Sequence, residues 1–183
     1  MPYIIIGVIV AIILVYLFMT YNSLIKRRNM VENQKSQIDV ELQRRFDLIP
    51  NLVEVVKGFA AHEKTTLEDV VKARNTYLNS GQDTAQALQA DNDLTGALSR
   101  LFALTEGYPE LKSNTNFLGL QNELSNTEKK IAFSRQFYND SVYKLNNLID
   151  MFPSNIVALL FGFKKQAFFE TTDNERKNIE IAL

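Results

Sequence analysis

The chain opens with an unbroken run of apolar residues. Residues 3–21 read YIIIGVIVAIILVYLFMTY, and no charged side chain occurs before Lys26. At about 1.5 Å per helical residue this run spans roughly 28 Å, close to the thickness of a bilayer's hydrocarbon core. We expect it to be helical, because lipid offers its backbone N–H and C=O groups no other partners. The pattern therefore predicts a membrane anchor over residues 1–25.

The side chains expected to contact lipid in this anchor are Tyr3, Ile4, Ile5, Ile6, Val8, Ile9, Val10, Ile12, Ile13, Leu14, Val15, Tyr16, Leu17 and Phe18. A cleaved secretory signal is the competing interpretation. Such signals begin with basic residues, carry a shorter apolar run and end in small residues. Here Met1 and Pro2 precede the run, and Tyr21-Asn22-Ser23 follows it. These differences favour a retained anchor.

Basic residues lie on one side of this anchor only. Lys26, Arg27 and Arg28 follow it, and no Lys or Arg precedes it. Because Lys and Arg gather on the cytoplasmic side of membrane spans, the three residues predict the topology. We expect the N-terminus outside, and the chain from Asn22 onward in the cytoplasm.

Helical spacing continues beyond the anchor. Apolar positions step by three and four residues over residues 38–59, which is an a/d pattern of the coiled-coil type with Arg45 as its one charged member. Its members are Ile38, Leu42, Arg45, Ile49, Leu52, Val56 and Phe59. Pro50 lies inside this pattern, so we expect a kink there, or a helix that stops and restarts.

Three further helices are expected, over residues 65–78, 84–105 and 114–150. Turn and capping residues separate them, among them Asn79-Ser80-Gly81 and Gly107-Tyr108-Pro109. The last helix carries an apolar stripe at seven-residue steps, formed by Phe117, Leu124, Ile131, Tyr138, Leu145 and Phe152. Its stripe needs other helices to cover it. The predicted fold is all-α: an elongated, mainly antiparallel bundle of about four long helices over residues 26–170, with a polar tail at 171–183.

A second apolar stretch follows this helix. It is too short to cross a bilayer. Three interpretations remain open: a short helix folded back on the bundle, a surface covered by another subunit, or a segment lying on lipid with Lys164 and Lys165 at the headgroups. The candidate interaction surface consists of Ile156, Val157, Leu159, Leu160, Phe161, Phe163, Phe168 and Phe169.

Composition offers little chemistry. The formal net charge is −1, so no global basic field attracts nucleic acid. The chain has no Cys, no Trp and a single histidine, His62, which leaves little for a metal site. Asp91 and Asp93 lack the spacing of a calcium loop and are interpreted as solvated or helix-start residues. Because none of the common catalytic motifs occurs, we expect no enzyme activity, no cofactor, no metal and no catalytic residue.

Arg45 is the one charge placed on an apolar stripe. Its head must reach water or meet an acid, because an unpaired buried charge is costly. Glu128, beside the stripe of the last helix, is the candidate partner, and Glu41 or Asp47 could serve locally. An exposed Arg45 on a slightly rotated helix is the alternative.

Two elements carry a family resemblance that covers nearly the whole chain. Residues 44–53 read RRFDLIPNLV, and residues 108–139 combine YPELK with LQNELSNTEKKIAFSRQFYN. The chain resembles the LemA family. The resemblance implies a single-pass protein of the bacterial cytoplasmic (inner) membrane with a helical bundle and its N-terminus outside. It implies no catalytic mechanism, and oligomerisation is the property that fits such proteins best.

Two functions therefore compete. The first is a membrane-anchored structural or scaffold protein that associates with copies of itself, since tethering in one plane raises the effective concentration. The second is a membrane-tethered adaptor that binds another membrane or cytosolic protein through an exposed helical or aromatic surface. In both, the lipid bilayer is a partner.

Overall fold

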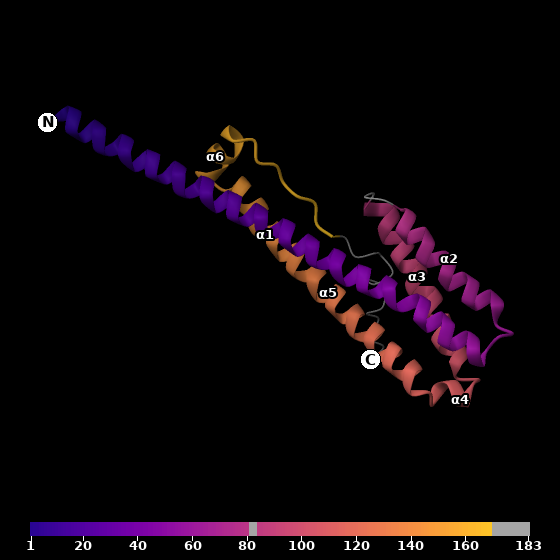
Figure 1. The fold of residues 1–183 in the computed structure, drawn as a ribbon. Helices are drawn as coiled ribbons and strands as arrows, with labels where there is room; N and C mark the ends of the chain where they lie inside the picture. Colours follow the sequence, from indigo (N-terminus) through magenta and orange to yellow (C-terminus); the bar gives the residue numbers. More distant parts are fainter. Residues whose placement is uncertain (81–83, 170–183) are drawn as a thin grey trace, which may run out of the picture. The chain divides into compact units, whose positions relative to one another are not determined.

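The structure is a computed structural model that describes residues 1–80 and 84–169. Over these residues it is all-helical, with no strand (Figure 1). The helices are α1 (Pro2–Phe59), α2 (Lys64–Asn79), α3 (Thr84–Thr105), α4 (Pro109–Lys112), α5 (Thr115–Asp150) and α6 (Ser154–Leu160). The predicted all-α class is confirmed. The predicted polar tail, residues 171–183, lies outside the described residues.

Two compact units divide the chain. Unit 1 combines Met1–Asp39 with the part of the chain that follows Ile131, and unit 2 is Val40–Ile131. Helices α1 and α5 contribute to both units, so the ends of each helix have different neighbours. The predicted boundaries at residues 25 and 170 follow sequence order and stay predictions.

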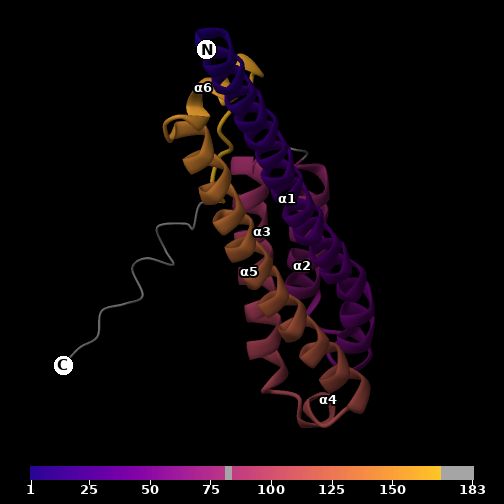
Figure 2. The same cartoon turned by 90° about the vertical axis from the view of Figure 1, so that its left-hand side faces the viewer.

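Unit 1 has an aliphatic core between α1, α5 and α6. Its fully or nearly fully buried members are Leu24, Val31, Val142, Leu145, Val157 and Ala158. Leu17, Tyr21 and Phe163 pack against this core and are themselves partly buried. In two perpendicular views α6 lies beside the N-terminal part of α1 (Figures 1 and 2). The short helix is thus folded back on α1 and α5 through its inner face.

A glycine ends α6 and directs the chain away from it. Gly162 has φ +69°, a backbone conformation that residues with a Cβ rarely adopt. The N–H of Phe163 donates to the carbonyl of Ala158 at 2.9 Å, and that of Gly162 to the carbonyl of Leu159 at 3.3 Å. This pair of bonds is a Schellman motif, which satisfies the last carbonyls of the helix.

Unit 2 packs α2, α3 and α4 with the C-terminal part of α1 and the N-terminal part of α5. Apolar side chains from each of these elements are completely buried, for example Ile49, Val70, Leu94, Leu111 and Phe117. Helix α5 begins with a side-chain cap, because the Oδ1 atom of Asn114 accepts from the N–H groups of Asn116 and Phe117 at 3.0 and 3.1 Å. An Asn cap of this kind stabilises a helix start.

Three details of the helices differ from the expectation. Of the two outcomes expected at Pro50, a helix that stops and restarts is wrong, because α1 continues to Phe59, and a kink stays a prediction. Phe59 is 39% exposed, because it is the last residue of α1. Phe152 is 79% exposed, because α5 ends at Asp150 and the stripe ends with it.

Candidate functional site

Arg45 occupies the interior of unit 2, and only 2% of its surface is exposed. It stands on the apolar face of α1, with Leu42 and Ile49 buried one turn away on either side. A charge at this depth needs partners that are hydrogen-bonded in turn. The structure supplies them from α3 and α5.

The Nη1 atom of Arg45 donates to Oδ1 of Asp91 at 2.8 Å and lies 3.1 Å from Oε2 of Glu128. Its Nη2 atom donates to the hydroxyl of Thr95 at 2.8 Å. That hydroxyl in turn donates to the backbone carbonyl of Asp91 at 2.9 Å. One guanidinium thus joins three helices, and the structure brings together the predicted pair Arg45 and Glu128.

The two carboxylates of this cluster differ in their surroundings. The side chain of Asp91 is 4% exposed, whereas that of Glu128 is 47% exposed. Glu128 borders an open groove of about 540 Å³ that Arg45, Thr95 and Phe102 also line. The interpretation of Asp91 as a solvated or helix-start residue is wrong, since its side chain is the buried partner of Arg45. Helical spacing places Asp91 about one turn from Leu94, on the inward side of its helix. It could not show that Asp91 meets Arg45, because the sequence did not show which helix packs against this one.

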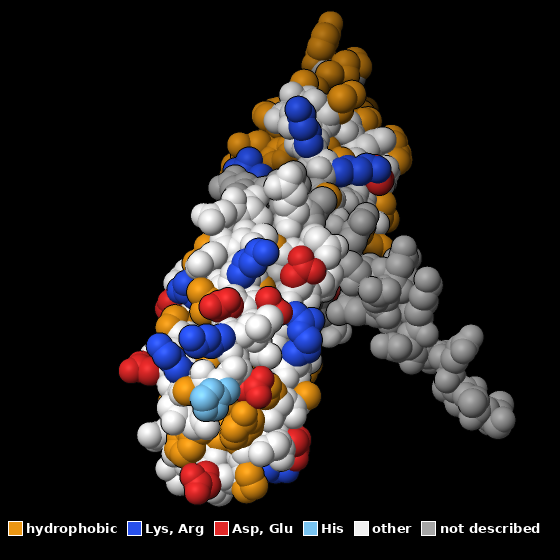
Figure 3. Space-filling model, turned by 90° about the vertical axis from the view of Figure 1, so that its right-hand side faces the viewer, with side chains coloured by type: hydrophobic (Ala, Val, Ile, Leu, Met, Phe, Trp, Pro, Cys, Tyr) orange, Lys and Arg blue, Asp and Glu red, His pale blue; other side chains and the backbone are white. Residues whose placement is uncertain are grey.

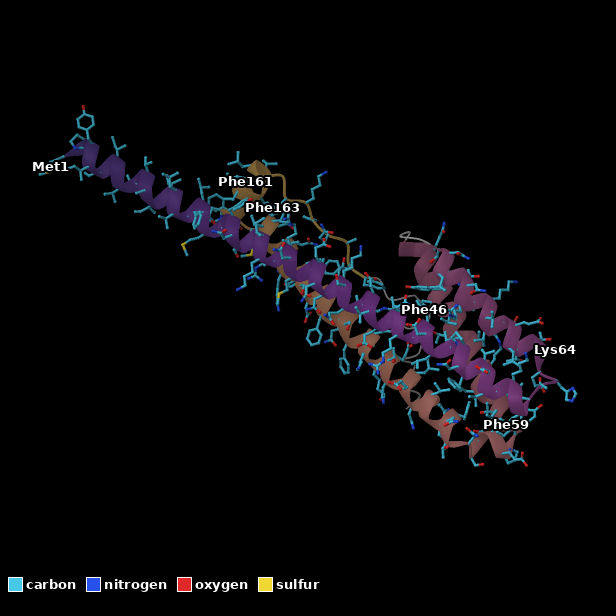
Figure 4. The ribbon with its side chains drawn as sticks, in the orientation of Figure 1. Met1, Phe46, Phe59, Lys64, Phe161 and Phe163 are labelled. Carbon is cyan, nitrogen blue, oxygen red and sulfur yellow. The ribbon has the colours of Figure 1, made fainter. Side chains whose placement is uncertain are left out.

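Pro50 is accommodated by an arginine from another helix. Proline has no N–H, so the carbonyl of Phe46, four residues earlier, loses its helical donor. The Nε atom of Arg74, on α2, donates to that carbonyl at 3.0 Å. The ring of Phe46 also contacts the ring of Tyr77, with centroids 4.5 Å apart. Figure 4 labels Phe46 on α1.

The RRFDLIPNLV stretch is therefore the hub of unit 2. Arg44 pairs with Glu123 of α5, Arg45 reaches α3 and α5, and Phe46 meets α2 through both its carbonyl and its ring. Each of these contacts joins one helix to another, so the role that they support is structural.

The second candidate set, residues 156–169, is divided by the structure. Val157 is 1% exposed and Phe163 is partly buried, because both pack on the core of unit 1, so Val157 is not part of a surface. The side chains of Ile156, Leu159, Leu160, Phe161 and Phe168 are all about half exposed or more. Phe169 is partly buried.

Two asparagines of α5 hold the non-helical segment formed by residues 164–169. The side-chain amide of Asn146 accepts from the N–H of Gln166 and donates to its carbonyl, both at 2.9 Å. Asn139 makes the same pair of bonds to Phe169, at 2.7 and 3.1 Å. The asparagines are separated by about 10.5 Å of helix. Three residues bridge that distance only when nearly fully extended, so the segment runs stretched and antiparallel to α5.

Further contacts hold the same segment. The hydroxyl of Tyr138 donates to the carbonyl of Ala167 at 3.1 Å, and Arg135 lies over the ring of Phe169, 4.9 Å from its centre. Burial and the negative charge of Glu32 raise the pKa of Tyr138. Arg135, Tyr138 and Asn139 belong to the SRQFYN part of the resemblance, so this motif contacts the segment it precedes.

Helix α1 contains the one stretch, among the described residues, that is long and apolar enough to cross a membrane. The anchor side chains are exposed, except for Leu17, which packs on the core of unit 1. Lys26 and Arg28 are exposed and Arg27 is half-buried. Which side of a membrane they face remains a prediction.

The surface of unit 2 mixes charges of both signs, and His62 lies exposed among them (Figure 3). Beside it, Glu63 accepts a hydrogen bond from the hydroxyl of Tyr108 at 3.0 Å, and this bond raises the pKa of Tyr108. In the described part of the chain no three His, Cys, Asp or Glu side chains converge as metal ligands.

One exposed feature escaped the sequence reasoning. Phe133 and Phe137 stand one turn apart on α5, with 59% and 57% of their surfaces exposed. Both fall outside the seven-residue stripe of that helix, at positions where polar residues are the rule. Their spacing of four residues was the signal that could have identified them.

Fold and contacts together define a helical protein with one N-terminal helix suited to anchoring it in a membrane. Residues 34–183 match the model of the LemA family. The chain belongs to the LemA family, as its two motifs indicated.

Curated relatives are more distant. The chain is 26% identical over 179 residues to the magnetosome protein MamQ 1 of Paramagnetospirillum magneticum, a match that covers 84% of this chain and 66% of the relative. MamQ of Magnetospirillum gryphiswaldense is also 26% identical, with 84% and 65% covered. Protein LemA of Metamycoplasma hominis is 24% identical, with 88% and 74% covered. The chain thus spans slightly less than two thirds of the length of the MamQ relatives.

Proposed function

We propose that this protein is a membrane-anchored scaffold that associates with copies of itself and has no catalytic activity of its own. It is held in the bacterial cytoplasmic membrane by α1, with its N-terminus outside and the rest of the described chain in the cytoplasm. The observation that carries the proposal is the pair of exposed rings on α5, Phe133 and Phe137.

Two neighbouring exposed phenylalanines are unfavourable in water. Burying one such ring gains about 1.5–3 kcal/mol, so a partner that covers both gains several kcal/mol before ordering costs. Unit 1 leaves both rings uncovered although it buries other side chains of α5, Val142 and Leu145 among them. A second copy is the occupant we favour, because every copy presents the same rings at the same height above the membrane.

The anchor restricts how two copies can meet. Copies in one bilayer are related by a rotation axis along the membrane normal, so their α5 helices meet in parallel. Position 137 of one copy then lies near position 137 of the other. Confinement to a plane raises the effective concentration, so a contact of this modest size suffices.

Single cysteines test this directly, because the natural chain has none. We introduce Phe137→Cys into the full-length protein and oxidise native membranes mildly. This variant should give a disulfide-linked dimer. Ser36→Cys, on an exposed part of α1 in the same unit, is the matched control and should stay monomeric. Equal crosslinking of both variants, or of neither, would refute the proposal. A reproducible adduct of Phe137→Cys to a different protein would replace the scaffold with the adaptor.

The Ser36→Cys variant also tests topology. In intact cells its thiol is expected to resist a membrane-impermeant maleimide and to react only after the membrane is opened. Labelling in intact cells would place this part of the chain outside and overturn the orientation.

A further inference from the structure

The turn around α6 exposes an uncharged, apolar outer face. Residues 151–163 read MFPSNIVALLFGF and carry no charge. On this face Leu159 is 84% exposed, Phe152 79%, Leu160 69% and Met151 62%. Surface leucines occur singly in many proteins, but several strongly exposed apolar side chains within one short segment mark a contact site.

The inner face of the same turn is firmly packed. Ser154, Val157 and Ala158 are almost completely buried, and the hydroxyl of Ser154 donates to the carbonyl of Met151 at 2.8 Å. Gly162 closes the helix with the Schellman motif described above. The inner face of α6 therefore packs on the core, and the outward side chains lie on the opposite face.

The ring contacts between α6 and α1 show at which part of the predicted membrane anchor α6 lies. The ring of Phe161 lies 4.7 Å from that of Tyr21, and the ring of Phe163 lies 6.0 Å from it, centroid to centroid. Figure 4 shows both phenylalanines beside α1. Leu17 and Tyr21 belong to the uncharged run of α1, and the first charge, Lys26, follows about 7.5 Å further along the helix. Helix α6 thus packs against the end of the uncharged run of α1 that lies nearest Lys26.

Basic side chains border the apolar face on its water side. Lys164 and Lys165 follow Phe163 directly, and Lys165 pairs with Asp150 at 2.7 Å. Arg28 lies over the ring of Phe163, 5.8 Å from its centre. An apolar face with cations at its edge is the arrangement that binds the interface of an anionic membrane.

We propose that the outer face of α6, centred on Leu159 and Leu160, is inserted into the cytoplasmic leaflet beside α1. Lipid acyl chains cover it, and Lys164 and Arg28 lie at the level of the headgroups. The turn is too short to cross the bilayer and gives the protein a second membrane contact from its C-terminal part. The proposal rests on α1 being embedded in lipid and not on self-association.

A tryptophan probe tests the depth of this face, because the natural chain has no Trp. Three full-length variants are reconstituted in vesicles of phosphatidylcholine and phosphatidylglycerol, with or without acyl-brominated phosphatidylcholine. Leu159→Trp reports on α6, Leu14→Trp on the anchor, and Phe133→Trp on α5 about 26 Å from its end at Asp150. All three positions are exposed, so each ring fits.

Brominated chains should quench much of the emission of Leu159→Trp and of Leu14→Trp, and little of that of Phe133→Trp. A Leu159→Trp signal that bromine leaves unchanged overturns the proposal. If that signal is also insensitive to aqueous iodide, a second copy covers the face; if iodide quenches it, water does. Loss of quenching in Leu14→Trp as well would show that the anchor itself has failed.

Discussion

Units 1 and 2 share two helices, α1 and α5, yet each unit holds them together by different means. Unit 2 pairs a buried guanidinium with one buried and one half-exposed carboxylate, and unit 1 has no charged residue in its described core. Unit 1 adds asparagine side chains that bind a stretched segment of backbone. The comparison shows that one pair of helices can be joined through a buried charge at one end and through an aliphatic core at the other.

The physical consequences of the two solutions differ. A buried ion pair adds little net stability, but losing one member is costly because the other stays buried without compensation. Amide bonds to an exposed segment are each weak, and losing one releases only what it held. Damage to unit 2 should therefore spread through several helices, and damage to unit 1 should stay local.

The largest effect is expected from Arg45→Ala. It leaves Asp91 buried without the guanidinium, and we expect a loss of about 3–5 kcal/mol in the stability of unit 2. Hydrogen exchange of the full-length protein in detergent should rise in α3 peptides and stay unchanged around Val142 and Leu145. An equal increase in hydrogen exchange in both units would refute the expected difference between unit 2 and unit 1.

A double variant serves as the control. Arg45→Met with Asp91→Leu replaces the charged pair with apolar side chains of similar size, and should recover most of the lost stability. If it is as unstable as Arg45→Ala, the cluster contributes more than the avoidance of an unpaired charge.

A smaller effect is expected from Arg74→Ala. It leaves the carbonyl of Phe46 without a donor and should cost about 1–3 kcal/mol in urea unfolding. Pro50→Ala restores the N–H that the carbonyl lacks, so in that background Arg74→Ala should cost clearly less. Strictly additive effects would show that Arg74 does not compensate for the proline.

In unit 1, Asn139→Ala and Asn146→Ala should each cost about 1 kcal/mol and act locally. We expect faster proteolysis within residues 164–169 and unchanged hydrogen exchange in α3. Asn147→Ala, at the neighbouring position, is the matched control and should resemble the natural protein. If the global unfolding midpoint falls as far as in Arg45→Ala, the local character of unit 1 is refuted.

The smallest effect concerns alkaline pH. Because the pKa of Tyr138 is raised on folding, its neutral form is favoured in the folded state. This contribution is complete below the unfolded pKa of about 10 and is lost as the pH rises through the folded pKa. Tyr138→Phe should therefore lose less stability than the natural protein above pH 10, as measured by urea midpoints across that range.

Much of the fold could be predicted from hydrophobic spacing alone. Helix α3 was predicted at the residues where it lies, and α5 within one residue at its start. The place of Arg45 on an apolar stripe left burial and exposure both open, and named Glu128 as a candidate partner; the structure shows Arg45 buried and beside Glu128. These features are local, or need only one assumption about packing.

The features that could not be predicted depend on contacts distant in sequence. Asp91 could not be assigned to Arg45 before the rotation of α3 was known. The donor that replaces the missing N–H of Pro50 is Arg74, a residue that local rules cannot connect to a carbonyl 28 positions earlier. Val157 was assigned to the surface because a seven-residue helix is too short for its spacing to show which side is inward.

The asparagine contacts of α5 bind backbone N–H and C=O groups, which every residue except proline offers alike. Asn139 and Asn146 would bind any extended segment equally well through two residues that are three positions apart. They therefore fix the path of the segment without selecting its side chains. Its position along that path must come from side chains, and the ring of Phe169, between Arg135 and Tyr138, is suited to that task. Gln166 should then be exchangeable for any residue except proline, which lacks the N–H that Asn146 binds, while position 169 should tolerate only another flat ring.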